Sequence, residues 1–343
     1  MITRGEALDL FRSPDLIGIG MAADGVRRKW HPENVVSYII DRNINYTNFC
    51  TEYCTFCAFY RPMGHAEGYV LPQETIFAKI QETLDLGGTG VLMQGGLHPD
   101  LKIGWYEDLF RAIKRRFPIH LHCLSAPEVA NIAEVSGLSL RDTIARLRDA
   151  GLDSIPGGGA EILDDAVRQR ISRLKCPVSE WMDVHRTAHQ LGMRTTATMM
   201  FGCGETVEQR MNHLDLIRSL QEETGGFTAF IPWTFQRENT SLGRFVKEEA
   251  TAVEYLQTLA ISRIYLDNFE NVQSSWVTQG LKTCQLGLRF GANDVGSIMI
   301  EENVVSAAGA HYRASEEELR RIIRDAGFVP RQRDTLYRRY FLD

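Results

Sequence analysis

Short runs of apolar residues alternate along most of the chain with longer segments in which apolar residues recur at helical spacing. In residues 73–86, Ile76, Ile80 and Leu84 lie on one helical face, and Gly87-Gly88 ends the segment. This pattern is typical of an amphipathic helix that ends at a glycine. Short apolar runs without helical spacing indicate buried strands. The predicted strands are residues 42–47, 90–94, 119–124, 152–155, 194–201, 227–231, 271–274 and 288–290.

Strands that alternate with helices favour a parallel sheet. Eight such strands in 343 residues predict an α/β fold, a complete (β/α)8 barrel of the TIM type with small terminal extensions. We expect an N-terminal helical extension in residues 1–34, the barrel in 35–312, and a C-terminal helix and tail packed on the barrel in 313–343. Because the last strands have the weakest pattern, a barrel of six strands with a C-terminal cap is the alternative.

Local signals predict several element boundaries. Ser315 and Glu318 form a capping-box pattern at the start of a helix over residues 315–326. Ser179, followed by Glu180, predicts the start of a second helix. Pro232 is expected to end the strand before it.

Composition excludes several classes of protein. The net charge of −6 argues against a general nucleic-acid or anionic-membrane binder. No run of about 18 apolar residues is present, which predicts no membrane span, and the first residues carry no apolar signal core. Seven cysteines, an odd number, do not indicate a secreted disulfide framework. We therefore expect a protein of the reducing cytoplasm.

Three of the cysteines lie together, in a C-x3-C-x2-C pattern formed by Cys50, Cys54 and Cys57. Thiolates this close repel one another unless a metal centre lies between them. Three thiolates leave a four-iron cluster one ligand short, so that one iron can bind another molecule. The alternative is a zinc site completed by a distant residue, although such sites more often show two paired half-sites. The other cysteines are scattered singly at Cys123, Cys176, Cys203 and Cys284.

Polar and glycine residues follow several predicted strands, where barrel enzymes place their chemistry. Gln94-Gly95-Gly96 follows the second strand, and bare glycines there would let a ligand approach the backbone, although an ordinary turn has the same pattern. Glu161 follows three glycines at the expected start of a helix over residues 161–169, where it would either bind a ligand or only complement the helix dipole. Arg170 lies one helix later, as a ligand for a carboxylate or as a surface residue.

Other candidates come from strand alternation. Thr198 lies on the same face of its strand as Thr196, which predicts that both line a barrel cavity or bond to backbone. His122 shares a face with His120, and this pair is expected to form a hydrogen-bonded wall rather than a metal site. Arg289, Asn293 and Asp294 cluster at the end of the last predicted strand, as a carboxylate clamp or as a structural turn.

The cysteine pattern, with Phe56 as the aromatic residue of C-x3-C-x-aromatic-C, resembles the signature of the radical S-adenosylmethionine (SAM) superfamily. The resemblance implies that Cys50, Cys54 and Cys57 hold a [4Fe-4S] cluster and that SAM chelates its fourth iron. Reductive cleavage of SAM would yield a 5′-deoxyadenosyl radical that abstracts hydrogen from a substrate. The residues expected to bind cofactor are Phe56, Phe59, Gln94, Gly95, Gly96, Glu161 and Arg170.

Six sequence blocks are similar to the menaquinone and deazaflavin branch of that superfamily; they are residues 41–48, 57–61, 94–99, 155–161, 196–202 and 289–294. Within the branch they resemble most the enzymes that cyclise dehypoxanthine futalosine in menaquinone biosynthesis. Arg173 departs from this pattern, which has a proline at that position.

That resemblance implies hydrogen abstraction at C4′ of the substrate ribose and addition of the resulting radical to the benzoate ring of the same molecule. Arg289, Asn293 and Thr198 are the expected substrate residues, and Glu161, His122 and Asp294 are the candidate bases. A flavodoxin or ferredoxin would donate the electron. The alternatives are a sister reaction, either aminodeoxyfutalosine synthesis or tyrosine coupling of the deazaflavin type, and a non-enzymatic protein whose metal centre is structural or senses redox state.

Overall fold

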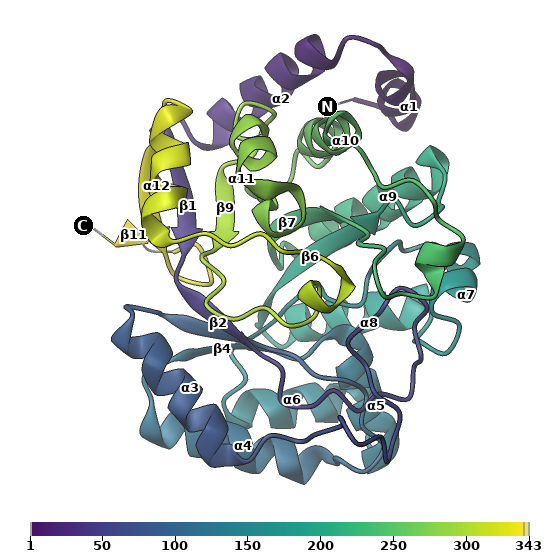
Figure 1. Ribbon diagram of the computed structural model, residues 1–343, viewed down its shortest axis with the longest axis vertical. Coiled ribbons are helices and arrows are strands. Elements are labelled where there is room, and N and C mark those ends of the chain that lie inside the picture. The colour runs from purple at the N-terminus through teal and green to yellow at the C-terminus, as the bar shows by residue number, and fades with distance from the viewer. Residues whose placement is uncertain (1, 339, 342–343) are drawn as a thin grey trace.

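The computed structural model describes residues 2–338, 340 and 341 and contains a seven-stranded parallel sheet (Figure 1). Neighbouring strands follow the order of the chain, and the first residues of β2 and β3, Asp41 and Gly90, lie in register. This confirms the predicted α/β barrel architecture, since each strand is joined to the next by a helical crossover. The strands are β2 (Asp41–Ile44), β3 (Gly90–Met93), β4 (His120–Cys123), β5 (Ser154–Ile155), β6 (Arg194–Phe201), β7 (Phe227–Thr234) and β8 (Asn271–Val272).

The helices form an outer layer around the strands (Figure 1). In α4, Leu109, Phe110 and Ile113 are buried against the sheet while the basic residues of the last turn are not, as the amphipathic pattern predicts. No helix in the described part of the chain is long and apolar enough to span a membrane. The α-helices are α1 (Arg4–Arg12), α2 (Leu16–Trp30), α3 (Gln73–Asp85), α4 (Ile103–Arg116), α5 (Ala126–Ser136), α6 (Leu140–Ala150), α7 (Asp165–Ile171), α8 (Val178–Gln190), α9 (Val207–Thr224), α10 (Ala252–Tyr265), α11 (Trp276–Gly287) and α12 (Glu316–Asp325).

A second sheet joins the two edges of the first. Its strand order is β11-β10-β1-β9, with β1 (Val35–Ile39), β9 (Asp294–Ser297), β10 (Val329–Arg333) and β11 (Tyr340–Phe341). Gln273, next to β8, forms a parallel bridge with Asp294 of β9, and β9 pairs in parallel with β1. Only Ile40 separates β1 from β2. Strand pairing therefore continues from β8 through β9 and β1 back to β2.

The predicted strand at residues 288–290 is wrong. These residues form turns after α11, with backbone bonds from Leu288, Arg289 and Phe290 to carbonyls three residues earlier. The apolar run exists because Leu288 and Phe290 are buried, and the Phe290 ring packs against Gly20 of α2. The strand that completes the ring is β9, whose short sequence contains Asp294 and Gly296 and does not look like a buried strand.

Three predicted boundaries also move, for reasons that lie outside the local sequence. β7 continues through Pro232 to Thr234, because β8 pairs only with the first half of β7 and needs no amide there. Helix α8 has no side-chain cap from Ser179; instead the Asp165 side chain accepts the Val178 amide. Helix α7 begins four residues after Glu161, because Asp164 caps it. The capping box of Ser315 and Glu318 is confirmed.

A buried ion pair fastens the C-terminal segment to the ring. The Arg333 guanidinium at the end of β10 donates to both carboxylate oxygens of Asp294, at 2.6 and 3.0 Å, and the Ser37 hydroxyl of β1 donates to the same carboxylate at 2.6 Å. The last segment is thus a strand of the structure as well as a packed helix. The boundaries at residues 34 and 312 stay a prediction.

Removing one partner of this pair should strongly destabilise the fold. Arg333→Met leaves the Asp294 carboxylate buried without its cation, and we expect the free energy of unfolding to fall by about 3–5 kcal/mol. Arg12→Met removes an arginine whose side chain is 65% exposed, and its expected cost is below about 1 kcal/mol. Urea unfolding of both variants tests this, and equal costs would contradict the importance of the buried pair.

Candidate active site

The inward faces of the strands enclose a cavity of about 320 Å³. Gln94, Gly158 and Glu161 line it where the strands end, and Asp41 and Arg333 line it at the opposite end. Thr196 and Thr198 face it from β6, as strand alternation predicts. The cavity therefore extends along the axis of the ring, from Glu161, whose partner Lys175 lies beside Phe56 of the cysteine loop, to the C-terminal segment.

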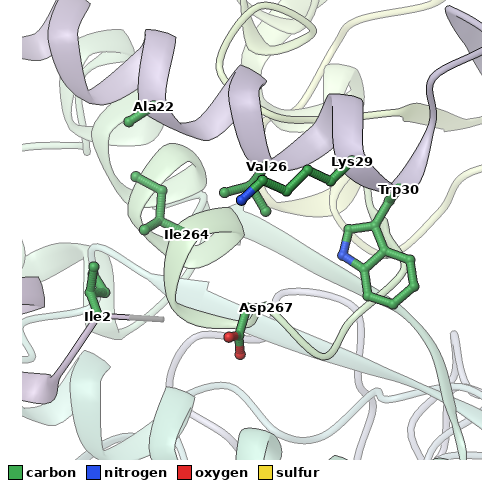
Figure 2. Close-up of a pocket in the computed structure, with 7 residues that line it drawn as sticks. All are labelled: Ile2, Ala22, Val26, Lys29, Trp30, Ile264 and Asp267. Atoms are coloured by element: carbon green, nitrogen blue, oxygen red, sulfur yellow. The ribbon is translucent and has the colours of Figure 1, made fainter.

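A larger hollow of about 570 Å³ lies elsewhere, on the outside between α2 and α10 (Figure 2). Ile2, Val26, Trp30 and Ile264 make its lining mainly apolar. It contains none of the predicted site residues. The smaller internal cavity is thus the candidate active site despite its size.

The cysteine loop follows β2 and is held by backbone bonds to other loops. The Thr51 amide donates to the Leu97 carbonyl at 3.1 Å, and the Thr55 amide donates to the Ile171 carbonyl at 2.8 Å. Cys54 is buried, while Cys50 and Cys57 are half-buried. Burial raises the pKa of the Cys54 thiol to about 12, and it also raises the pKa of Cys50. Thiols such as Cys50 and Cys54 ionise only with a positive partner close by.

The glycine turn after β3 lies directly against the cysteine loop. A Cβ atom on Gly96 would lie 2.1 Å from the Phe49 carbonyl oxygen and 2.7 Å from the Cys50 Cβ, so only glycine fits. The Gly95 amide donates to the Glu128 carboxylate at 2.9 Å. Sequence reasoning paired the two motifs from their positions after neighbouring strands, and the structure brings them into contact.

Glu128, which the sequence analysis did not identify as a site residue, holds this turn in place. Its carboxylate also accepts from the Tyr46 hydroxyl at 2.7 Å and from the amide and hydroxyl of Ser125, both at 2.7 Å. Burial raises the pKa of Glu128 to about 7, against these donors, which lower it. The only local signal was the capping box that Glu128 forms with Ser125 at the start of α5.

Glu161 lies in the loop before α7, with a positive φ of 42°. Its Oε1 accepts from Lys175 Nζ at 2.8 Å, and its buried Oε2 has no hydrogen-bond partner. Lys175 Nζ also lies 5.1 Å from the centroid of the Phe56 ring. Burial opposes the charge of Lys175, but the Cys54 and Glu161 anions outweigh burial and raise its pKa. A single lysine gives no sequence signal, so Lys175 was missed.

His122 and Thr198 line the cavity wall. Ser154 Oγ lies 2.7 Å from His122 Nδ1 and 2.7 Å from His120 Nε2, which confirms the predicted hydrogen-bonded wall. Burial lowers the pKa of His122 to about 3, so its imidazole is neutral at physiological pH. The Thr198 hydroxyl donates to the Gly157 carbonyl at 2.6 Å. Both groups therefore form part of the cavity wall without bringing a charge into the cavity.

Apart from the three cysteines, Phe56 and the Gly95-Gly96 turn, five more predicted site residues do not line the cavity. Asp294 is held by Arg333, and Asn293 is buried between the Arg263 guanidinium and the Asn271 amide. Arg289 donates to the Ala326 carbonyl outside the ring. Arg170 is exposed and donates to the Gly204 carbonyl, and Phe59 lines a different surface pocket. The cluster of residues 289–294 is thus structural, because the turns after α11 carry Arg289 away from β9.

Comparison with known proteins agrees with this geometry. A family model described as "Radical SAM superfamily" matches residues 44–217, and one described as "CofH/MqnC C-terminal region" matches residues 224–341. The chain belongs to the radical SAM superfamily. It is 51% identical to cyclic dehypoxanthine futalosine synthase from Halalkalibacterium halodurans, over 97% of this chain and 90% of the relative. It is 42% identical to 5-amino-6-(D-ribitylamino)uracil–L-tyrosine 4-hydroxyphenyl transferase from Methanothermobacter thermautotrophicus, over 98% and 94%.

The fold of this radical SAM chain is similar to that of methylornithine synthase. The two structures superpose with a TM-score of 0.74 over 96% of this chain and 94% of the other, at 18% sequence identity. At that identity the likeness concerns the fold alone. It supports the predicted barrel class independently of the cysteine motif.

The radical SAM family implies an iron–sulfur cluster and SAM, and the described residues fit both. In the described part of the chain, no three His, Cys, Asp or Glu side chains converge as they would around a single metal ion. Cys50 and Cys54 each lie close enough to Cys57 for its charge to raise their pKa values, as expected of three ligands of one centre. The unpartnered Oε2 of Glu161 needs a donor, which a polar group of SAM would supply.

Gly96→Ala should disturb the cysteine loop without affecting the rest of the fold. The added Cβ would overlap the Phe49 carbonyl, so we expect iron incorporation and SAM cleavage to fall at least about tenfold, as for other clashes at a catalytic backbone. Gly104→Ala is the matched control, because a Cβ there meets nothing within 4 Å. Iron content and 5′-deoxyadenosine formation after anaerobic reconstitution measure both. Equal behaviour of the two variants would contradict the close contact.

Proposed function

We propose that the chain is a radical SAM cyclase that converts dehypoxanthine futalosine to cyclic dehypoxanthine futalosine in menaquinone biosynthesis. The observation that carries the proposal is 51% identity, over nearly the full length of both chains, with a cyclic dehypoxanthine futalosine synthase. The second candidate is a sister reaction of the deazaflavin type, which the 42% identity with a tyrosine 4-hydroxyphenyl transferase favours. The higher identity places the cyclase first.

In this proposal Cys50, Cys54 and Cys57 hold the [4Fe-4S] cluster. The bound cluster and SAM supply a 5′-deoxyadenosyl radical by one-electron reductive cleavage. The Gly95-Gly96 backbone lies beside SAM, and the free Oε2 of Glu161 accepts from a polar group of SAM. Lys175 offsets the negative charge that the thiolates and Glu161 concentrate at this end.

The cavity holds the substrate between its two ends. Thr198 and His122 give it neutral polar walls, so ribose and benzoate can be oriented without a competing charge. Hydrogen abstraction occurs at C4′, and the carbon radical adds to the ring of the same molecule, a step that depends on proximity. Enclosure by the ring of strands keeps water from the radical. The proposed setting is the reducing cytoplasm, with a flavodoxin or ferredoxin as electron donor.

Only the three clustered cysteines should be needed for the iron–sulfur cluster. Cys54→Ala removes one of the three ligands. We expect this variant to lose essentially all of the cluster absorbance near 400 nm and all SAM cleavage. Cys284→Ala, at a buried cysteine beside Ser274, is the control and should retain both. The assignment fails if the two variants lose iron to the same extent.

Deuterium at C4′ of dehypoxanthine futalosine should appear in 5′-deoxyadenosine. The reason is that abstraction at this position starts the ring closure, and mass spectrometry of an anaerobic single-turnover reaction measures the transfer. A reaction with tyrosine and the ribityl uracil serves as the comparison. If the enzyme consumes SAM only with tyrosine, or if the label remains in the futalosine product, the sister reaction is correct.

A further inference from the structure

Three carboxylates line the cavity in the described part of the chain, and two are already engaged. Glu161 is paired with Lys175, at the end of the cavity near the cysteine loop. Glu302 accepts three backbone amides of its own loop, from Val304 at 2.8 Å, Val305 at 2.9 Å and Ser306 at 2.7 Å. A carboxylate used in this way holds its own loop together.

The third carboxylate is Asp41, the first residue of β2. The Ser297 hydroxyl donates to the Asp41 backbone carbonyl at 3.5 Å and lowers the pKa of the Asp41 carboxyl. The charged groups that face it are Arg333 from β10 and Asp294 from β9, and these two are paired with each other. Asp41 is thus a cavity carboxylate with no cation of its own. The sequence places it just before the first predicted strand, in the similar block 41–48, and gives it no role.

Burial raises the pKa of Asp41 to about 6, with Ser297 and Arg333 lowering it and Asp294 raising it. A carboxylate of this basicity is ionised at neutral pH but accepts a proton more readily than an ordinary surface aspartate. The three bases suggested by the sequence are less suited. Burial lowers the pKa of His122 to about 3, and Glu161 and Asp294 are both ion-paired.

Asp41 also lies at a suitable depth. It stands three residues before the end of β2, or about 10 Å from the end that carries the cysteine loop. SAM and the ribose occupy the cysteine-loop end in the proposed function, so the benzoate ring lies further in, towards Asp41 and Arg333.

We propose that Asp41 is the general base that removes the ring proton after ring closure, an inference that rests on the proposed function. Addition of the C4′ radical to the ring forms one C–C bond and leaves a cyclohexadienyl radical with an sp³ C–H carbon. That C–H bond breaks, and its proton goes to the Asp41 carboxylate. The broken C–H bond leaves two electrons on the ring, which already carries one unpaired electron. Two of these three electrons restore the aromatic π system. The third would go to a one-electron acceptor, a role that the oxidised iron–sulfur cluster held by Cys50, Cys54 and Cys57 would supply.

Asp41→Asn tests this role, because asparagine keeps the shape but cannot take the proton. We expect the substrate Kd of the cluster-free protein, measured by calorimetry, to change less than about threefold, and deuterium transfer from C4′ to continue. The yield of cyclised product per 5′-deoxyadenosine should fall by about 10²-fold, the lower end of the usual general-base contribution. Asp108→Asn, on the exposed face of α4, is the control and should match the wild type.

The pH profile gives a second readout. Asp41 is protonated below its pKa, so wild-type product formation should decline as pH falls through about 6, and Asp41→Asn should lack that decline. If Asp41→Asn does not fold, Ser297→Ala tests the same base, because loss of the hydroxyl should move the decline to higher pH.

Three outcomes overturn the role of Asp41: an unchanged product yield in Asp41→Asn, a parallel loss of binding and deuterium transfer, or an unmoved decline in Ser297→Ala. Failure of the proposed function itself is distinct, since the wild type would then transfer no deuterium from C4′.

Discussion

The buried pair of Arg333 and Asp294 is the contact on which the closed ring depends. It joins three strands that are far apart in the chain, because Ser37 of β1 donates to the same carboxylate. It also forms one end of the cavity, where Arg333 is part of the lining. A charge pair in this place is costly to bury and requires good geometry, which the two short bonds supply. The mutual neutralisation of the pair leaves Asp41 beside it without a cation of its own.

The opposite end of the cavity has a different electrostatic problem. The Cys54 thiol and the Glu161 carboxylate both lie near Lys175 there, and Lys175 is the cation between them. The space at this end is also limited, since Gly96 leaves room for the cysteine loop only because it has no side chain. Glu128 fixes this turn through the Gly95 amide. The site is thus held by a backbone contact and a buried carboxylate, neither of which touches the cavity.

Between these ends the cavity is mainly apolar and nearly uncharged, with Ile231, Trp233 and Trp276 in its lining. His122 is kept neutral by burial, and Thr198 is bonded to backbone. A radical reaction requires positioning and exclusion of water more than it requires charge, so such walls suit the chemistry that the family implies. In the proposed function, charge is needed only where SAM would bind and where a proton would leave, and these are the two ends of the cavity.

The sequence by itself determined the features that depend on neighbours in the chain. The spacing of Cys50, Cys54 and Cys57 identified the family, and the capping box of Ser315 and Glu318 marked the start of α12. Strand alternation placed Thr198 on the cavity wall. Each is a short-range pattern with a physical cause within a few residues.

Tertiary structure alone decided the rest, because the partners are remote. Leu288 and Phe290 look like a strand but are buried in turns, while β9 looks polar because Asp294 meets Arg333, 39 residues further along the chain. Glu161 lies in a loop and not at a helix start, and its partner Lys175 carries no pattern. Asp41 became a candidate base only when β9 and β10 folded around it, since burial and unpaired charge are properties of the closed ring.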